Sequence, residues 1–187
     1  MNRKNHAYLL RNTRKVHRIT GATLFSFFFV VSITAFLLGW KKNSNGFLLP
    51  QTQQGTLVSH EKFISIDSVQ KIALIQFEKD YKSLTPSIDR IDIRPENAVA
   101  KVVFDNDYYE VQVDLGNGSI LQTASRRSDF VENIHDGSIL DVLFKTNSSV
   151  FKLIYTSIMS LALLLFTVSG FWLWYGPKVM RRLRGSD

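Results

Sequence analysis

The chain has 187 residues, no cysteine and a formal net charge of +7. The lack of cysteine excludes disulfides, thiol catalysis, cysteine-ligated metals and covalent c-type haem attachment. The charge is unevenly distributed, because residues 43–149 hold ten basic and fifteen acidic residues, a net charge of −5. The basic residues at the chain ends are typical of membrane topology and contact with lipid headgroups, so we do not expect nucleic acid as a partner.

Two long segments, residues 19–40 and 153–177, carry no charged side chain. Each is longer than the roughly 20 apolar residues that cross about 30 Å of hydrocarbon. The sequence therefore predicts transmembrane helices at residues 19–40 and 150–176. The first segment is too long and too bulky for a cleaved signal peptide, and we interpret it as a retained anchor.

The basic residues next to the two spans predict the topology. Residues 1–18 contain six Lys or Arg and no acid, and residues 177–187 contain four Lys or Arg against Asp187. Lys41 and Lys42 oppose this pattern, but they are outnumbered. The positive-inside rule therefore places both termini in the cytoplasm and residues 41–149 on the outer side.

The region between the spans predicts a small folded domain at about residues 62–126. Ser65 is a helix N-cap candidate, and apolar residues follow it with helical spacing to about residues 81–84. From residue 88 the period changes to two. This change predicts four antiparallel strands, with turns at residues 105–107 and 116–118. About 60 residues is near the lower limit for a self-sufficient core, so we expect support from the membrane or a partner.

The rest of the chain leads back into the membrane. Residues 133–137 predict a turn, and residues 138–146 predict a short apolar helix at the membrane interface. Aromatic residues at 171–175 are typical of a cytoplasmic interface belt, and Gly176-Pro177 is predicted to end the helix there. The predicted fold class is an α+β membrane protein with two transmembrane helices. These bracket a small extracytoplasmic domain, built from one helix and an antiparallel β-meander.

Three segments carry a resemblance to a known family. They are residues 14–21 (RKVHRITG), residues 64–73 (ISIDSVQKIA), and residues 133–137 (NIHDG) followed by residues 168–174 (VSGFWLW). Their order and spacing resemble the PepSY-associated transmembrane proteins. The resemblance implies a bacterial inner-membrane protein with a periplasmic PepSY-like domain. Larger relatives have further spans, and some are siderophore-iron reductases that carry b-type haem on membrane histidines.

With this resemblance, two histidines become candidate haem b ligands, His17 and His135. Gly21 lies one helical turn after His17 and could leave room for a flat ring, and Arg14 and Arg18 could pair with haem propionates. The alternative for His17 is an interfacial residue that meets lipid phosphates. The alternative for His135 is a side chain that orders its turn by hydrogen bonding.

The predicted topology separates the two candidates. His17 lies at the cytoplasmic end of the first span and His135 on the outer side, about 30 Å away across the hydrocarbon. One copy cannot hold one haem between them, so a second ligand must come from another copy or another protein, or the haem must be five-coordinate. His6 and His60 have no comparable surroundings in the sequence.

Three functions remain open from the sequence. The protein could be an accessory or assembly subunit of a larger membrane complex, in contact with lipids and with a membrane-protein partner or further copies of itself. It could be a haem-binding electron-transfer protein in ferric-siderophore reduction or iron uptake, and thus a ferric reductase component. It could be an anchored periplasmic binding or inhibitory module. We find no self-contained catalytic motif and no metal-binding spacing.

Overall fold

The protein is described here from a computed structural model, in which the described residues are 3–57, 59–81, 85–105, 108–144, 146 and 149–184. Contacts divide the chain into two compact units. The helical unit consists of Met1–Ala35 and Asn133–Asp187, and the sheet unit is Phe36–Glu132.

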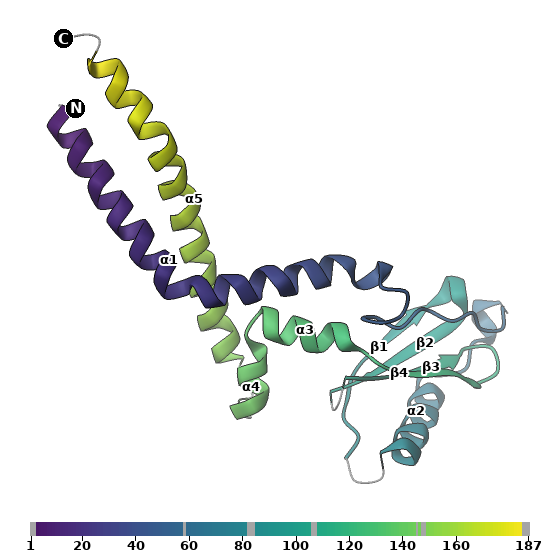
Figure 1. Cartoon of the computed structure of the whole chain (residues 1–187). Coiled ribbons are helices and arrows are strands. Elements are labelled where there is room, and N and C mark those ends of the chain that lie inside the picture. The colour runs from purple at the N-terminus through teal and green to yellow at the C-terminus, as the bar shows by residue number, and fades with distance from the viewer. Residues whose placement is uncertain are drawn as a thin grey trace. The chain divides into compact units, whose positions relative to one another are not determined.

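Two long helices form most of the helical unit. Helix α1 is Arg3–Trp40, of which the residues up to Ala35 belong to this unit, and α5 is Val150–Arg184. Along its first part α1 lies beside α5 and antiparallel to it, with the start of α1 and the end of α5 at the same end of the pair, and α1 then bends (Figure 1). Close contacts hold them together: the rings of Phe28 and Phe166 are 5.2 Å apart, and Gly176 packs against Leu10.

Both helices are long and apolar enough to cross a membrane. Only 6% and 11% of their most apolar windows are buried, so neither is the core helix of a soluble fold. The prediction that α5 ends at Gly176-Pro177 is wrong, because the helix continues through Pro177 to Arg184. A proline removes one backbone hydrogen bond and can kink a helix without ending it.

Shorter helices precede α5. Helix α3 is Arg127–His135 and α4 is Ser138–Phe144. The prediction that residues 133–137 form a turn is wrong for the first three, which are the last residues of α3. The chain bends at Asp136 and Gly137, and Gly137 has a φ of +80°. A Cβ on Gly137 would lie 2.6 Å from Cγ of Tyr155, so glycine is required both for the backbone and for the approach of α5.

The sheet unit confirms the predicted helix and meander. Helix α2 is Ile66–Asp80, and the side chain of Ser65 accepts a hydrogen bond from the backbone N–H of Ser68 as its N-cap. Residues 82–84 and 106–107, where the sequence predicts the helix end and part of a turn, lie outside the described residues. The strands are consecutive and antiparallel in the order β1-β2-β3-β4: Ile88–Arg94, Val99–Phe104, Tyr109–Asp114 and Ile120–Ser125.

Both faces of the two central strands, β2 and β3, are buried. One face packs against Val69, Ala73 and Phe77 of α2 and forms the hydrophobic core. The other face is polar, and the extended segment at residues 51–56 covers it. Gln112, for example, donates from Nε2 to the carbonyl of Gln51 and accepts at Oε1 from the N–H of Gln53. The buried side chains of Gln112 and Asp114 thus find partners in the covering segment.

Candidate functional site

The first candidate site surrounds His17 on α1. The Nδ1 of His17 is 2.7 Å from Oγ of Ser169 on α5, and the ring of Phe166 packs edge-on against the imidazole at 4.6 Å. The half-buried His17 ring therefore lies between the two long helices, with a fixed orientation.

The hydroxyl of Ser169 has a second acceptor nearby, the carbonyl oxygen of Phe166 at 3.3 Å. When this carbonyl takes the hydroxyl proton, Ser169 Oγ accepts from Nδ1–H of a neutral His17. Nε2 of His17 then keeps its lone pair, which is the form of imidazole that binds a metal.

His135, at the end of α3, has the same arrangement. Its Nδ1 is 2.9 Å from Oγ1 of Thr34, a buried residue of α1. The Thr34 hydroxyl proton is shared between the carbonyl oxygens of Val30 at 2.9 Å and Val31 at 3.1 Å. When these carbonyls take the hydroxyl proton, Thr34 Oγ1 accepts from Nδ1–H of a neutral His135, and Nε2 of His135 keeps its lone pair. The imidazole lines a groove of about 380 Å³, together with side chains of α1 and α5.

The structure does not bring the two imidazoles together. His17 and Thr34, the partner of His135, are 17 residues apart on α1, which corresponds to about 26 Å of helix. Two imidazoles on one metal ion stand only about 4 Å apart, twice a metal–nitrogen bond of about 2 Å. One copy of the chain therefore supplies one imidazole at each of two separate positions.

The other predicted site residues lie around His17. Arg14 and Arg18 are exposed on α1. Gly21 does not leave an open slot, because a Cβ there would lie 3.3 Å from Cζ of Phe166; the glycine instead lets that ring approach α1. The space lies at Gly170, where a Cβ would meet only Cε1 of His17, at 3.8 Å.

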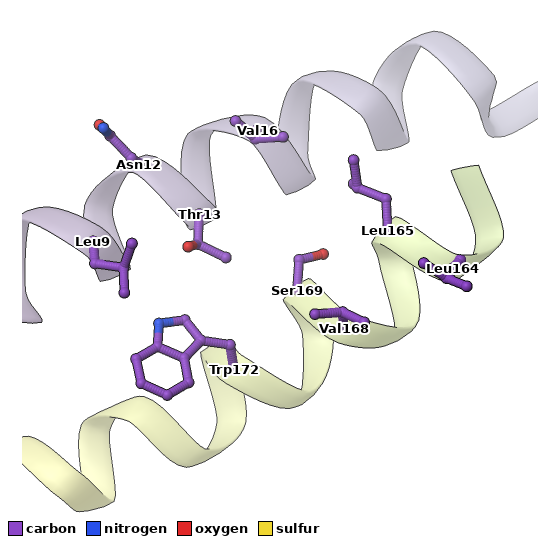
Figure 2. A pocket seen from close by; sticks show the side chains of 9 residues that line it. All are labelled: Leu9, Asn12, Thr13, Val16, Leu164, Leu165, Val168, Ser169 and Trp172. Atoms are coloured by element: carbon purple, nitrogen blue, oxygen red, sulfur yellow. The ribbon is translucent and has the colours of Figure 1, made fainter. Parts of the chain in front are cut away.

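A groove of about 610 Å³ runs between α1 and α5 beside this site. Figure 2 shows Leu9 of α1 facing the Trp172 indole of α5, with Ser169 further along the same wall. Ser169 thus lines the groove and also holds His17. The indole Nε1 of Trp172 and Nδ1 of His6 are buried without a hydrogen-bond partner. The groove is lined by Leu9, Asn12, Thr13, Val16, Leu164, Leu165, Val168, Ser169 and Trp172.

Packing between α1 and α5 also gives the depth of His17 along the helix pair. Ser169 precedes Trp174 by five residues, which is about 7.5 Å of helix. His17, which contacts Ser169, thus lies further toward the middle of α5 than Trp174, and the exposed Arg14 and Arg18 flank it on α1.

Comparison with known families gives a match over most of the chain. The pattern of the PepSY-associated TM region matches residues 14–186, which include most of both long helices and everything between them. The chain belongs to the PepSY-associated transmembrane family. A comparison with curated proteins gives no match. This PepSY-associated protein is therefore a membrane protein, and α1 and α5 are its membrane helices.

The sheet unit of the PepSY-associated protein contains a second candidate site on its polar face. Glu110 is fully buried and contacts Arg126 closely, while Nζ of Lys101 lies 3.7 Å from its other carboxylate oxygen. Arg126 also binds Asp129, with 2.8 Å between Nε and Oδ2. Burial alone would raise the pKa of Asp129, but the hydrogen bond and charge of Arg126 hold it below its usual range.

Sequence reasoning found both histidines but missed the groups that position them. Ser169 and Gly170 belong to a motif that carries the family resemblance, and this was the available signal. Thr34 has no signal in the sequence. Among the residues that the structure describes, no group of three or more His, Asp or Glu could hold a metal ion.

Proposed function

We propose that this PepSY-associated protein is a haem-binding electron-transfer subunit of a membrane assembly. The observation that carries the proposal is the pair of imidazoles, His17 and His135, each held at Nδ1 by a hydroxyl. A hydroxyl that accepts from Nδ1–H leaves Nε2 free to bind iron. Haem b, when bound, supplies an iron that alternates between the ferric and ferrous states. The two positions lie far apart along the helical unit, as a path for electrons across a membrane requires.

In the proposed assembly, a second subunit supplies the second histidine ligand of each haem. A two-fold axis along the membrane normal brings every residue to the same depth as its counterpart in the second copy. A symmetric dimer would therefore pair His17 with His17 and His135 with His135. A membrane-protein partner with its own histidines would serve equally, which joins the accessory-subunit and electron-transfer interpretations in one proposal.

Neighbouring residues support the haem-binding role of His17. Ser169 orients the imidazole ring, and Gly170 places no side chain against it, because a Cβ there would lie 3.8 Å from Cε1 of His17. Arg14 and Arg18, exposed nearby on α1, are the candidates to pair with propionate carboxylates.

We further propose a bacterial inner-membrane protein with cytoplasmic termini and a periplasmic sheet unit. The basic ends of the chain support this topology, and α4 exposes Val142, Leu143 and Phe144, as expected of a helix at the outer interface. In this orientation a haem held by His17 would lie nearer the cytoplasm and a haem held by His135 nearer the outer side, so that the two could relay electrons outward. The family resemblance suggests a chelated ferric ion as the acceptor, in iron uptake.

The absence of cysteine gives a clean test of topology, because each single-cysteine variant has only one reactive thiol. A membrane-impermeant maleimide applied to spheroplasts should label Asn117→Cys of the sheet unit. It should label Asn5→Cys of α1 only after lysis. The reverse pattern would overturn the proposed orientation.

The haem proposal is tested on the full-length protein, produced with ample haem and purified in mild detergent. We expect a Soret absorbance band from haem. The His17→Ala and His135→Ala variants should each lose one of the two haem positions, and the double variant should lose both. His60→Ala, in the sheet unit, is the matched control and should keep the full band. A wild-type protein without haem absorbance would overturn the proposal.

A further inference from the structure

The polar face of the sheet unit contains a pocket of about 500 Å³ with an excess of positive charge. Four cationic side chains line it, and they come from three separate segments of the chain. Two carboxylates also line it. These charged lining residues are Lys42, Arg94, Lys101, Arg126, Asp92 and Glu96.

Lys101 is the buried cation of this pocket, with a side chain only 7% exposed. Its ion pair with Glu110 is 3.7 Å long, which is beyond a normal hydrogen bond. Glu110 already contacts Arg126 closely and accepts a hydrogen bond of 2.7 Å from Nε2 of Gln112. One carboxylate therefore serves two cations and an amide, and Lys101 is left with a weak partner.

The remaining carboxylates near the pocket do not balance its positive charge. Asp129, the second partner of Arg126, is shared with Arg90 at 3.3 Å. Within the described part of the chain, neither Arg94 nor Lys42 forms an ion pair.

The surroundings of Lys101 are consistent with an unmet need for negative charge. Burial is the largest cause that lowers its pKa, and the positive charges of Arg126 and Arg94 lower it further. The charge of Glu110 raises the pKa but does not outweigh them. A buried cation without full compensation is costly, so an anion that entered the pocket would be stabilised.

We propose that this pocket binds a small oxyanion, a carboxylate or a phosphate group, with Lys101 at its buried end. Arg94 supplies a planar fork that suits two oxygens of one group, and Lys42 adds a mobile charge. Asp92 is engaged by Arg90 at 3.7 Å. Glu96 is exposed at the pocket and disfavours a second anionic group there. The oxyanion could be a soluble molecule or the phosphate of a lipid headgroup, since Lys42 follows the end of α1 by two residues.

The test uses the full-length protein in nanodiscs of phosphatidylcholine, titrated calorimetrically with inorganic phosphate at constant ionic strength. We expect saturable binding that Arg94→Gln weakens by about tenfold or more, which is about 1.4 kcal/mol. Arg94 is exposed, so this variant should fold normally. Lys101→Met should abolish binding while the unfolding midpoint stays equal or rises, because Glu110 keeps Arg126 and methionine keeps the apolar stem.

The control is Lys71→Gln, which removes an exposed lysine of α2 and should leave phosphate binding unchanged. A second set of nanodiscs contains phosphatidylglycerol. Weaker phosphate binding in these nanodiscs would identify a lipid headgroup as the source of the oxyanion, and unchanged binding would identify a soluble one. The proposal is overturned if phosphate does not bind saturably, or if Lys71→Gln weakens binding as much as Arg94→Gln does.

Discussion

The two units of this protein use polar groups in opposite ways. The sheet unit buries a charged and polar network on one face of its sheet, and most of that network is structural. The helical unit exposes most of its apolar side chains, as expected in lipid, and two of its polar contacts between helices each hold a histidine. In lipid there is no hydrophobic driving force that brings helices together. Polar contacts between the helices therefore say more about function than apolar contacts do.

The largest expected effect comes from a substitution that breaks the buried network of the sheet unit. Glu110→Gln leaves Arg126 and Lys101 buried with no charge between them, which should cost about 3–5 kcal/mol of unfolding free energy. Chemical denaturation, monitored by hydrogen exchange of the strand amides, measures this loss of unfolding free energy. Glu78→Gln, on the exposed surface of α2, is the control. A loss no larger than that of the control would show that the network is not structural.

A smaller effect is expected from crowding the helical unit. In Gly176→Val the new Cβ would lie 2.5 Å from Cδ2 of Leu10, so the two long helices must move apart. We expect a cost of about 1–3 kcal/mol, as for other overpacked sites. Unfolding in detergent, followed by tryptophan fluorescence, measures it. Gly39→Val has open space around its Cβ and should be nearly neutral; equal costs would argue against the packing of α1 on α5.

The helix cap of the sheet unit should have a still smaller effect. Ser65→Ala removes the side chain that accepts from the N–H of Ser68, and we expect a loss of about 1 kcal/mol. Ser59→Ala removes a serine that makes no such cap bond before its short helix. Ser65→Ala should lower the melting temperature more than Ser59→Ala does. Equal melting temperatures would contradict the assigned cap.

The smallest expected effect is a dependence of stability on acid pH that comes from Asp114 of the sheet unit. Burial alone would raise the pKa of Asp114, but hydrogen bonds from Thr56 and from the Gly116 and Asn117 backbone lower it. The folded pKa is then below the unfolded one, so the stabilisation is complete above about pH 4 and is lost as the pH falls through the folded value. Asp114→Asn should make the stability of the sheet unit less dependent on pH in this range. An unchanged acid profile would contradict the assignment.

Elements with strong local signals were predictable from the sequence. The two spans, the cap at Ser65 and the four strands each carry a pattern within a few residues. Helix α3 was not predicted, since its nine residues bury only Ser128 and show little apolar periodicity. The burial of the polar face of β3 was not predicted, because its cover comes from a distant segment at residues 51–56.

The candidate site was predictable only in part. His17 and His135 could be chosen for their chemistry and position in the sequence. Their partners, Ser169 and Thr34, are 152 and 101 residues away along the chain, so only the packing of helices identifies them. The same holds for Gly21 and Gly170, since the packing of Phe166 decides which glycine leaves open space.

The central claim is that His17 and His135 both present an unprotonated Nε2. Nitrogen NMR of the haem-free, full-length protein with ¹⁵N-labelled histidine tests it at about pH 8, where an ordinary imidazole is neutral. Signals are assigned by the loss of each in the His17→Ala and His135→Ala variants. The account predicts a protonated Nδ1 and a bare Nε2 at both residues, with Ser169→Ala releasing the preference at His17. A protonated Nε2 at either residue in the wild-type protein would contradict it.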